Sequence, residues 1–322
     1  MNKVNLCWVF SEGRPGHEIQ SSTLASHIAH QSDTHVFSLR QPWLSLTPRI
    51  IPGFKKGLIW QENNKPDFMM PPDVIITAGR IAAAVGKFVS QRFRYQGIKV
   101  NHIHILNPRD SASNYDLLLL PEHDQKSGSN IISYSGSIHP FDSLWFNRNL
   151  GAQPGQDIQS AIVIGNPPKD YFKQQLAADL KKIRRLNNNG SLMVCGSPRL
   201  PTYHLVPIKA LLRKDDCFWF GDEDGANPYR RILCHAQHIF VTADSINMMN
   251  ECAASKVPVT LLATSWIKSP KHKRFIHALG HRWSDFETIT KPVSRAPYAL
   301  SQIVNDVKFQ KLLNSPNSSN SG

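Results

Sequence analysis

The stretch FVTADSINMMNECAASKVP, residues 240–258, contains the pattern that decides how we expect the chain to fold. Its opening residues form an apolar run typical of a buried strand, and a polar turn at 243–245 ends that run. The residues after the turn have a composition that favours a helix. A buried strand that passes through a short turn into a helix is the repeating unit of a parallel sheet covered by helices on both faces.

The same succession of strand, turn and helix recurs along the rest of the chain. Short apolar runs predict buried strands at residues 4–10, 73–77, 100–106, 117–120, 161–165, 191–195, 217–220, 239–242 and 259–263. Helical patterns follow some of these runs, at 17–30, in the Ala-rich residues after Arg80, and at 171–187. Because the pattern restarts near residue 161, we predict an α/β fold with two Rossmann-like domains facing a cleft.

The domain boundaries follow from length and composition. A chain of 322 residues exceeds one ordinary core and suits two domains. A linker is expected at 150–156, between an N-terminal Rossmann-like domain at 1–150 and a C-terminal one at 157–300. A closing helix is expected at 301–313, and the Ser- and Asn-rich residues 314–322 are predicted to form a disordered tail.

The composition excludes global disorder and points to an anionic partner. Hydrophobic residues make up 41% of the chain, which is enough to fill real cores. Lys and Arg total 37 against 24 Asp and Glu, a net charge of +13. That excess should attract phosphate-bearing small molecules, anionic lipid or nucleic acid, unless it is only a generally basic surface. Since the sequence has no DNA-binding motif or aromatic-basic repeat, no nucleic-acid partner is expected.

Neither a membrane helix nor a secretion signal is apparent. No apolar run approaches the roughly 20 residues that a membrane-spanning helix needs. The five cysteines form no CxxC pair, which is typical of reduced thiols in a cytosolic protein. We therefore expect a cytoplasmic protein, and its basic charge leaves open a peripheral position on the cytoplasmic face of the membrane.

The loop after the first strand is the first candidate site. Its glycines, Gly13 and Gly16, allow a ligand to approach the backbone closely, and Arg14 can hold an anion. His17 stands at the start of the predicted helix and is a candidate base, because imidazole titrates near neutral pH. The alternative is a structural turn with a capping histidine. The loop is not GxGxxG, so nicotinamide binding is not indicated.

Other charged side chains follow later strands of the same half. Arg80 and Arg109 are candidate anion ligands on the same cleft. Glu122 and Asp124 could orient a sugar, activate a hydroxyl or bind a cation, or they could belong to an ordinary polar loop. His102 and His104 alternate within one strand and share a face. Without a third ligand in sight they favour packed histidines over a metal site, and no metal is expected.

The second half offers a phosphate site at the turn quoted above. Asp244 and Ser245 suit the cap of a helix, whose free N–H groups and positive dipole end attract phosphate. Glu251 lies about two turns further on and could accept hydrogen bonds from a ribose. The alternative is an ordinary capped helix with a solvated glutamate. Walker A, GxSxG and HExxH motifs are absent, so kinase, serine hydrolase and zinc peptidase functions are not supported.

The quoted stretch resembles the donor-site helix of GT-B glycosyltransferases, such as the UDP-N-acetylglucosamine transferase of peptidoglycan synthesis. In that helix a glutamate is followed by Ala-Ala and then by Gly-x-Pro. Here Glu251, Ala253-Ala254 and Pro258 match, and Lys256 stands at the position of the glycine.

A wider set of stretches resembles the "elongated mitochondria" fission-factor family of plants and its bacterial relatives, often described as glycosyltransferases. The matching stretches are residues 12–21, 73–80, 107–109, 121–124, 164–167, 190–192, 225–229 and 240–258. The family usually has Ser-Arg-Arg after its Gly-Ser-Leu strand. This chain has Ser197-Pro198-Arg199 there, so one of the two arginines is missing.

These resemblances imply a glycosyltransferase that uses a nucleotide-diphosphate sugar and no cofactor. They make the C-terminal domain the donor side; its implied donor-binding residues are Ser197, Arg199, Asn227, Asp244, Ser245 and Glu251. The N-terminal domain would hold a glycan or lipid-linked acceptor, such as lipopolysaccharide core. Its base would be His17 first, with Glu122 or Asp124 next. The alternative is a non-catalytic, membrane-associated adaptor that retains the GT-B-like fold.

Overall fold

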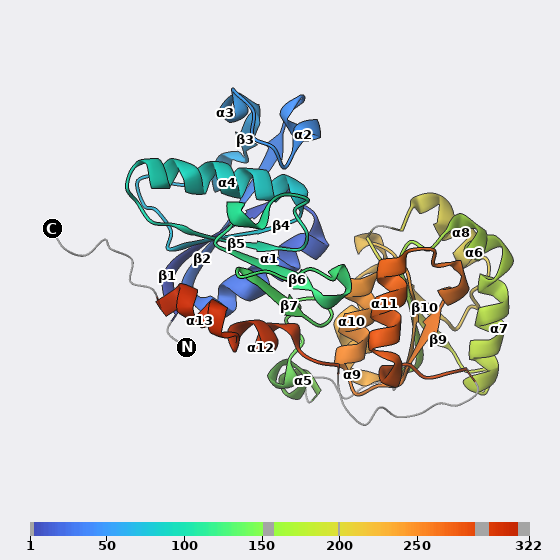
Figure 1. Ribbon diagram of the computed structural model, residues 1–322. Coiled ribbons are helices and arrows are strands. Elements are labelled where there is room, and N and C mark those ends of the chain that lie inside the picture. The colour runs from blue at the N-terminus through green and yellow to red at the C-terminus, as the bar shows by residue number, and fades with distance from the viewer. Residues whose placement is uncertain (1–2, 151–157, 199, 287–295, 315–322) are drawn as a thin grey trace. The chain divides into compact units, whose positions relative to one another are not determined.

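The chain divides into two compact units. The computed structural model describes residues 3–150, 158–198, 200–286 and 296–314 (Figure 1). The first unit comprises residues 1–140 together with 298–322, and the second comprises 141–297. This division differs from the predicted one at residue 150, because residues 141–150 belong to the second unit and the C-terminal segment returns to the first. Most of the expected linker, 151–156, lies outside the described residues.

The first unit is built on a seven-stranded sheet in the order β3-β2-β1-β4-β5-β6-β7. Its strands are β1 (Val4–Ser11), β2 (Ala29–Leu39), β3 (Leu58–Trp60), β4 (Val74–Ala78), β5 (Asn101–Ile105), β6 (Leu117–Pro121) and β7 (Ile131–Tyr134). Neighbouring strands are parallel except for β3, which pairs antiparallel with β2. Its helices are α1 (Pro15–Ile28), α2 (Trp43–Leu46), α3 (Phe54–Gly57), α4 (Arg80–Tyr95), α12 (Ala299–Val304) and α13 (Val307–Asn314).

Helices cover both faces of this sheet, which is why its central strands are apolar throughout. Successive residues of β1 serve different cores: Val9 packs with α1, α12 and α13, whereas Trp8 and Phe10 pack with α4. Every residue of β4, β5 and β6 is buried. The period of two along a strand thus divides its side chains between two apolar layers.

The prediction missed β2, β3 and β7. β2 begins directly after α1, and its sequence AHQSDTHVFSL is polar over its first half, where its side chains are largely exposed. β3 is only three residues long and lies at the sheet edge. At the C-terminus, two helices replace the single expected one at 301–313. Asn314, assigned to the tail by the prediction, is the last residue of α13.

The second unit has a five-stranded, fully parallel sheet in the order β10-β9-β8-β11-β12. Its strands are β8 (Ile158–Ile164), β9 (Leu192–Gly196), β10 (Cys217–Trp219), β11 (Ala236–Thr242) and β12 (Val259–Leu262). Its helices are α5 (Ser143–Leu150), α6 (Lys169–Gln174), α7 (Leu176–Leu186), α8 (Leu205–Lys209), α9 (Tyr229–His235), α10 (Ile246–Ala254) and α11 (Pro270–Ala278). The helix predicted at 171–187 is therefore two helices, divided at Gln175.

Each sheet reverses its strand order once, between β1 and β4 in the first unit and between β8 and β11 in the second. Sheets of this kind bind ligands outside the carboxyl ends of the strands at such a switch point. The predicted α/β fold with two Rossmann-like units is confirmed. Among the described residues, no helix combines the length and apolarity needed to cross a membrane.

Candidate functional site

A carboxylate holds an imidazole at the switch point of the first unit. Glu12 follows β1, and its side chain is only 8% exposed. Its Oε1 accepts a hydrogen bond from Nδ1 of His17 at 3.2 Å and forms an ion pair with Nε of Arg14 at 3.1 Å. Because an ionised carboxylate only accepts, Nδ1 of His17 carries the proton in this contact, and when the ring is neutral its lone pair is on Nε2. This is the tautomer that a general base needs.

The same imidazole lies against the carboxyl end of the neighbouring strand. A Cβ at Gly79, the residue after β4, would overlap the ring of His17. Gly79 also has φ +81 and ψ 163, a conformation almost restricted to glycine. His17 therefore reaches from α1 across the β1–β4 switch point, and glycine is the residue that leaves room for it.

The loop that carries these residues is itself held in place. The N–H of Gly13, at φ +78, donates to Oγ of Ser11 at 3.1 Å, and that hydroxyl donates to Glu18 at 2.5 Å. Arg14 is 65% exposed, so its guanidinium can meet an anion while Nε stays on Glu12. Gly16, in the first turn of α1, accepts a hydrogen bond from Gln20 at 3.0 Å.

The other predicted cations of this unit are placed differently. Arg80, the first residue of α4, donates from Nη1 to the carbonyl of Thr47 at 3.0 Å. Arg109 is exposed in a turn of positive φ, where its N–H donates to Oδ1 of Asn107 at 2.9 Å. Arg80 is thus bound to the α2–α3 segment, whereas Arg109 extends from the loop after β5.

Glu122 and Asp124 lie further along the same edge. They form a short 3₁₀ turn after β6, with Glu122 exposed and Asp124 half-buried. Two strands, β4 and β5, separate β6 from β1. At about 4.8 Å per strand, β6 lies roughly 14 Å from β1, so these carboxylates belong to another part of the edge than His17.

His102 and His104 are buried beneath this edge. Oγ1 of Thr77 lies 2.8 Å from Nε2 of His102 and 2.7 Å from Nδ1 of His104, so one hydroxyl bridges both rings. Burial lowers the pKa of His102 to about 3 and that of His104 well below its ordinary value. Both rings are therefore neutral parts of the core. The part of the chain that the structure describes contains no cluster of three or more metal-binding side chains.

At the switch point of the second unit, the side chain of Asp244 lies at the carboxyl ends of β8 and β11. Its Oδ2 accepts the N–H of Asn166 at 2.7 Å, and a Cβ at Gly165 would overlap its carboxylate. Nε2 of His272 donates to the carbonyl of Asp244 at 2.9 Å. The Asp244 side chain therefore crosses from β11 to the loop after β8 instead of capping α10.

This placement changes the role that Asp244 can have. Ser245 is the backbone N-cap of α10, but its side chain makes no capping hydrogen bond. A carboxylate beside a diphosphate would repel it, so Asp244 suits a sugar hydroxyl better than a phosphate. Phosphate binding at this end would fall to the free N–H groups in the first turn of α10.

Glu251 is buried and paired rather than solvated. The hydroxyl of Tyr229 donates to its Oε2 at 2.6 Å, and Glu251 is 8% exposed. Burial, and then the charge of Glu251, raise the pKa of Tyr229 well above its ordinary value. Asn227 accepts the N–H of Tyr229 on Oδ1 at 2.9 Å, which fixes the start of α9. Asn227, Tyr229 and Glu251 thus form one connected polar cluster.

The remaining predicted donor residues follow β9 and β10. The N–H of Ser197 donates to the carbonyl of Ile164 at 2.7 Å, which places Ser197 beside the end of β8. Arg199 lies outside the described residues. The acidic loop after β10 supports its own backbone, because Oδ2 of Asp224 accepts the N–H of Phe220 at 2.8 Å.

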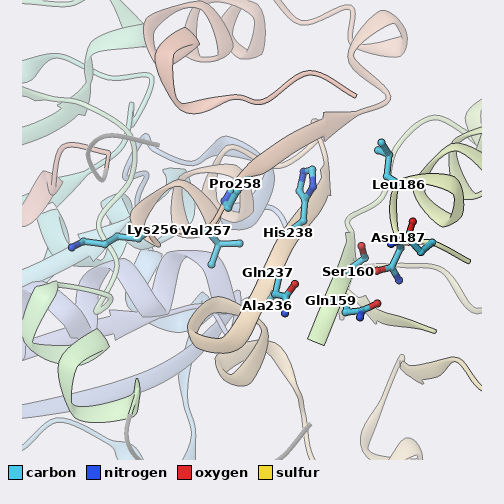
Figure 2. Close-up of a pocket in the computed structure, with 11 residues that line it drawn as sticks. Gln159, Ser160, Leu186, Asn187, Ala236, Gln237, His238, Lys256, Val257 and Pro258 are labelled. Carbon is cyan, nitrogen blue, oxygen red and sulfur yellow. The ribbon is translucent and has the colours of Figure 1, made fainter. Parts of the chain in front are cut away.

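A pocket of about 560 Å³ lies at the opposite, amino edge of the second sheet (Figure 2). It is lined by the first residues of β8 and β11, the end of α7 and the segment before β12. Nε2 of His238 is bonded to Thr260 at 2.8 Å, and Nδ2 of Asn187 donates to Ser191 at 3.0 Å. Lys256 extends away from the other labelled side chains in Figure 2. None of the predicted site residues lines this pocket.

The sequence reasoning missed two residues that shape these sites. Glu12 lies in one of the matching stretches but is not among the predicted site residues. Its position two residues before Arg14 and five before His17 is a local signal that could have indicated a contact with both. His272 comes from α11, and nothing in its local sequence connects it with Asp244. Contacts of this second kind depend on the tertiary fold.

Comparison with known proteins agrees with this architecture. The family model described as "Mitochondrial fission ELM1" matches residues 15–295. The chain is 25% identical to "Uncharacterized protein RP120" of Rickettsia prowazekii (strain Madrid E), over 84% of this chain and 87% of that protein. It is 20% identical to "Mitochondrial fission protein ELM1" of Arabidopsis thaliana, over 61% of this chain and 53% of that protein.

One solved structure with a TM-score above 0.5 shows the same fold. The S. aureus MnaA–UDP co-structure has a TM-score of 0.51 at 13% identity, covering 99% of this chain and 100% of that one. The spinosyn rhamnosyltransferase SpnG has a TM-score of 0.43 at 10% identity, covering 96% of this chain and 94% of that one. The similarity to MnaA at this level of identity concerns the fold alone.

Proposed function

The chain belongs to the mitochondrial fission ELM1 family, and on that premise we propose that it is a glycosyltransferase using a nucleotide-diphosphate sugar. Its acceptor is a glycan or a lipid-linked glycan, such as lipopolysaccharide core. The observation that carries the proposal is the Glu12–His17 pair, an imidazole oriented by a buried carboxylate at a switch point of the sheet. Such a pair orients and activates a base in many enzymes.

The second unit supplies the donor side of the proposal. Glu251 is positioned by Tyr229 and would accept hydrogen bonds from the ribose, with Asn227 shaping the base pocket. Ser197, the N–H groups at the start of α10 and Arg199 would hold the diphosphate. Asp244 would accept a hydrogen bond from the sugar. Support comes from the MnaA structure, which is a co-structure with UDP.

The chemistry is a substitution at the anomeric carbon. The acceptor hydroxyl attacks that carbon, Nε2 of His17 takes the hydroxyl proton, and the bond to the diphosphate oxygen breaks. The leaving diphosphate carries away the electron pair. Its charge is stabilised by Arg199 and by the N-terminal end of α10. Arg14 and the glycines Gly13 and Gly16 would receive the acceptor. This sequence of steps requires no cofactor.

A non-catalytic, membrane-associated adaptor is the second candidate function. The observation that favours it is the carboxylate of Asp244, which takes the N–H of Asn166 where a phosphate would otherwise find a donor. The Arabidopsis relative is named as a mitochondrial fission protein, which is compatible with a role in recruitment. The two functions differ in one property, the binding of a nucleotide sugar.

Thermal unfolding in the presence of UDP-, GDP-, ADP- and CMP-sugars tests the proposal. Ligand at about 100 times its Kd stabilises the native state by about 2.7 kcal/mol, so one nucleotide class should raise Tm by several degrees. The control is Glu251→Ala, which should reduce that rise. Unchanged Tm with all four classes would reject the transferase and favour the adaptor.

A further inference from the structure

Residues 40–60 of the first unit form a surface with an unusual charge pattern, which we call the α2–α3 surface. The sequence contains no Asp or Glu between Asp33 and Glu62. Within that stretch lie four cations, all exposed: Arg40, Arg49, Lys55 and Lys56. No carboxylate of the same segment is available to neutralise them, so this surface carries a local excess of positive charge.

Apolar side chains are interspersed with these cations. Leu46 at the end of α2 is 43% exposed, and Ile59 in β3 is 37% exposed. Trp43, Ile50 and Ile51 are half-buried on the same segment. In Figure 1, α2 and α3 lie beyond α4, next to the edge strand β3 of the first sheet. Leucine, isoleucine and tryptophan among lysines and arginines are the composition of interfacial membrane-binding segments.

The surface is held in one shape by its own core. A Cβ at Gly57 would overlap the indole of Trp43, and the indole N–H donates to the carbonyl of Pro52 at 3.2 Å. Phe54 is buried and packs on Phe88 of α4, with ring centroids 5.2 Å apart. The side chains of Trp43 and Phe54 therefore pack inward, and the four cations remain exposed.

This surface is connected to the edge that carries the candidate base. Arg80 donates to the carbonyl of Thr47, between α2 and α3. Arg80 directly follows Gly79, the residue against which the ring of His17 lies. The side chain of Arg80 thus links the α2–α3 surface to Gly79, which lies at the β1–β4 switch point.

We propose that the α2–α3 surface docks this protein on an anionic phospholipid bilayer. Its cations face the lipid phosphates, while Leu46 and Ile59 enter the interface between headgroups and acyl chains. The docking itself is independent of catalysis. Its consequence for catalysis rests on the proposed function: docking brings the hydroxyl of a lipid-linked acceptor to the edge where His17 lies.

Sedimentation with phospholipid vesicles tests the docking, using the full chain and thermal unfolding as the check on folding. The variant combines Arg40→Gln, Arg49→Gln, Lys55→Gln and Lys56→Gln. The matched control combines Lys173→Gln, Lys181→Gln, Arg185→Gln and Lys214→Gln, four exposed cations of the second unit. Both variants lower the net charge from +13 to +9, because each loses four cations.

The proposal predicts a clear difference between the two variants. On vesicles of phosphatidylglycerol and phosphatidylcholine, the α2–α3 variant should bind at least about tenfold more weakly than the wild type, and the control should stay within about twofold. Equal loss in both variants would show that net charge alone attracts the protein and would overturn the proposal. So would absence of wild-type binding to these vesicles.

A second variant tests the apolar contribution. Leu46→Ser combined with Ile59→Ser leaves the charge unchanged and should weaken binding to the mixed vesicles at raised salt, where charge attraction is screened. Unchanged binding would reject insertion. The nucleotide-sugar shift of Tm should be the same in all these variants. Lost docking with a retained shift would leave the proposed function standing, and docking without any shift would reject that function alone.

Discussion

The two switch points have the same topology but opposite chemistry. In the first unit a carboxylate, Glu12, stands behind an imidazole, and the imidazole lies against Gly79. In the second unit it is the carboxylate of Asp244 itself, not an imidazole, that lies against Gly165. Each unit thus uses a glycine at one strand end to admit a side chain from the other side of the switch point.

The difference between these two side chains determines the chemistry that each switch point can support. A neutral imidazole with a free Nε2 can remove a proton from a hydroxyl, whereas a carboxylate bonded to a backbone N–H accepts hydrogen bonds and repels anions. The fold supplies the location, and the side chain placed there determines the chemistry. The first point suits an acceptor hydroxyl, and the second suits the neutral part of a donor.

The largest expected effect tests the first switch point. His17→Ala should lower turnover about 10²- to 10⁴-fold, because it removes the proposed base, and should leave the donor-dependent rise of Tm unchanged. Release of nucleoside diphosphate in the presence of acceptor measures the turnover. Glu12→Gln serves as the companion variant: it keeps the size of the side chain, weakens its hold on Nδ1 and should lower turnover less. Wild-type turnover without His17 would move the base elsewhere.

The next effect concerns acid stability, in which the first sheet should be the more sensitive one. His102 has a pKa of about 3 in the folded protein and near 6.5 when unfolded, so the unfolded state binds its proton first. The contribution is fully present above pH 6.5 and falls by about 1.4 kcal/mol per pH unit as pH drops towards 3. Thermal unfolding between pH 7 and about 4.5 should show a shallower decline in His102→Asn. An identical slope would show that His102 is not responsible.

The donor side should respond more modestly. Glu251→Ala should weaken nucleotide-sugar binding about 10- to 100-fold, because it removes hydrogen bonds to a charged acceptor. Tyr229→Phe removes only the hydroxyl that holds Glu251 and should cost less than that. Titration of the donor by calorimetry measures both. Equal affinity in Glu251→Ala would remove this residue from the site and leave the second switch point without a ribose contact.

The last prediction compares the two glycines directly. Gly79→Ala places a side chain at φ +81 and displaces His17, so it should destabilise the protein by about 1 to 3 kcal/mol. Gly165→Ala lacks the positive φ and meets only the carboxylate of Asp244, so its cost should be smaller. Denaturant unfolding measures both. A larger loss in Gly165→Ala would mean that Asp244 is fixed more firmly than His17.

Much of the fold could be predicted because the central strands are apolar on both faces. Strands such as β4 and β6 are continuous buried runs, and α4 follows β4 at once. β2 could not be recognised, since its side chains are exposed where it begins and its pairing with β1 is set by the tertiary fold. The boundary at residue 140 was missed for the same reason, because Phe146 of α5 packs into the core of the second unit with residues far along the chain.

The candidate site was predictable in location more than in geometry. Residues after strand ends meet at one edge of a parallel sheet, so Gly13, His17 and Arg80 could be named in advance. The direction of each side chain depends on partners far along the chain: Arg80 on Thr47, and Asp244 on Asn166, 78 residues away. No local pattern reveals such partners.

The return of α12 and α13 has a consequence for how the polypeptide matures during translation. The first core contains Ala299, Leu300, Ile303 and Phe309, so it cannot close until residues 299–309 have been synthesised. The second unit is one uninterrupted stretch, 141–297. All of its residues are therefore synthesised before α12 and α13 of the first unit. Nascent domains generally fold as units while they leave the ribosome. The second unit is therefore the first able to reach its native state, and the first unit must wait for α12 and α13.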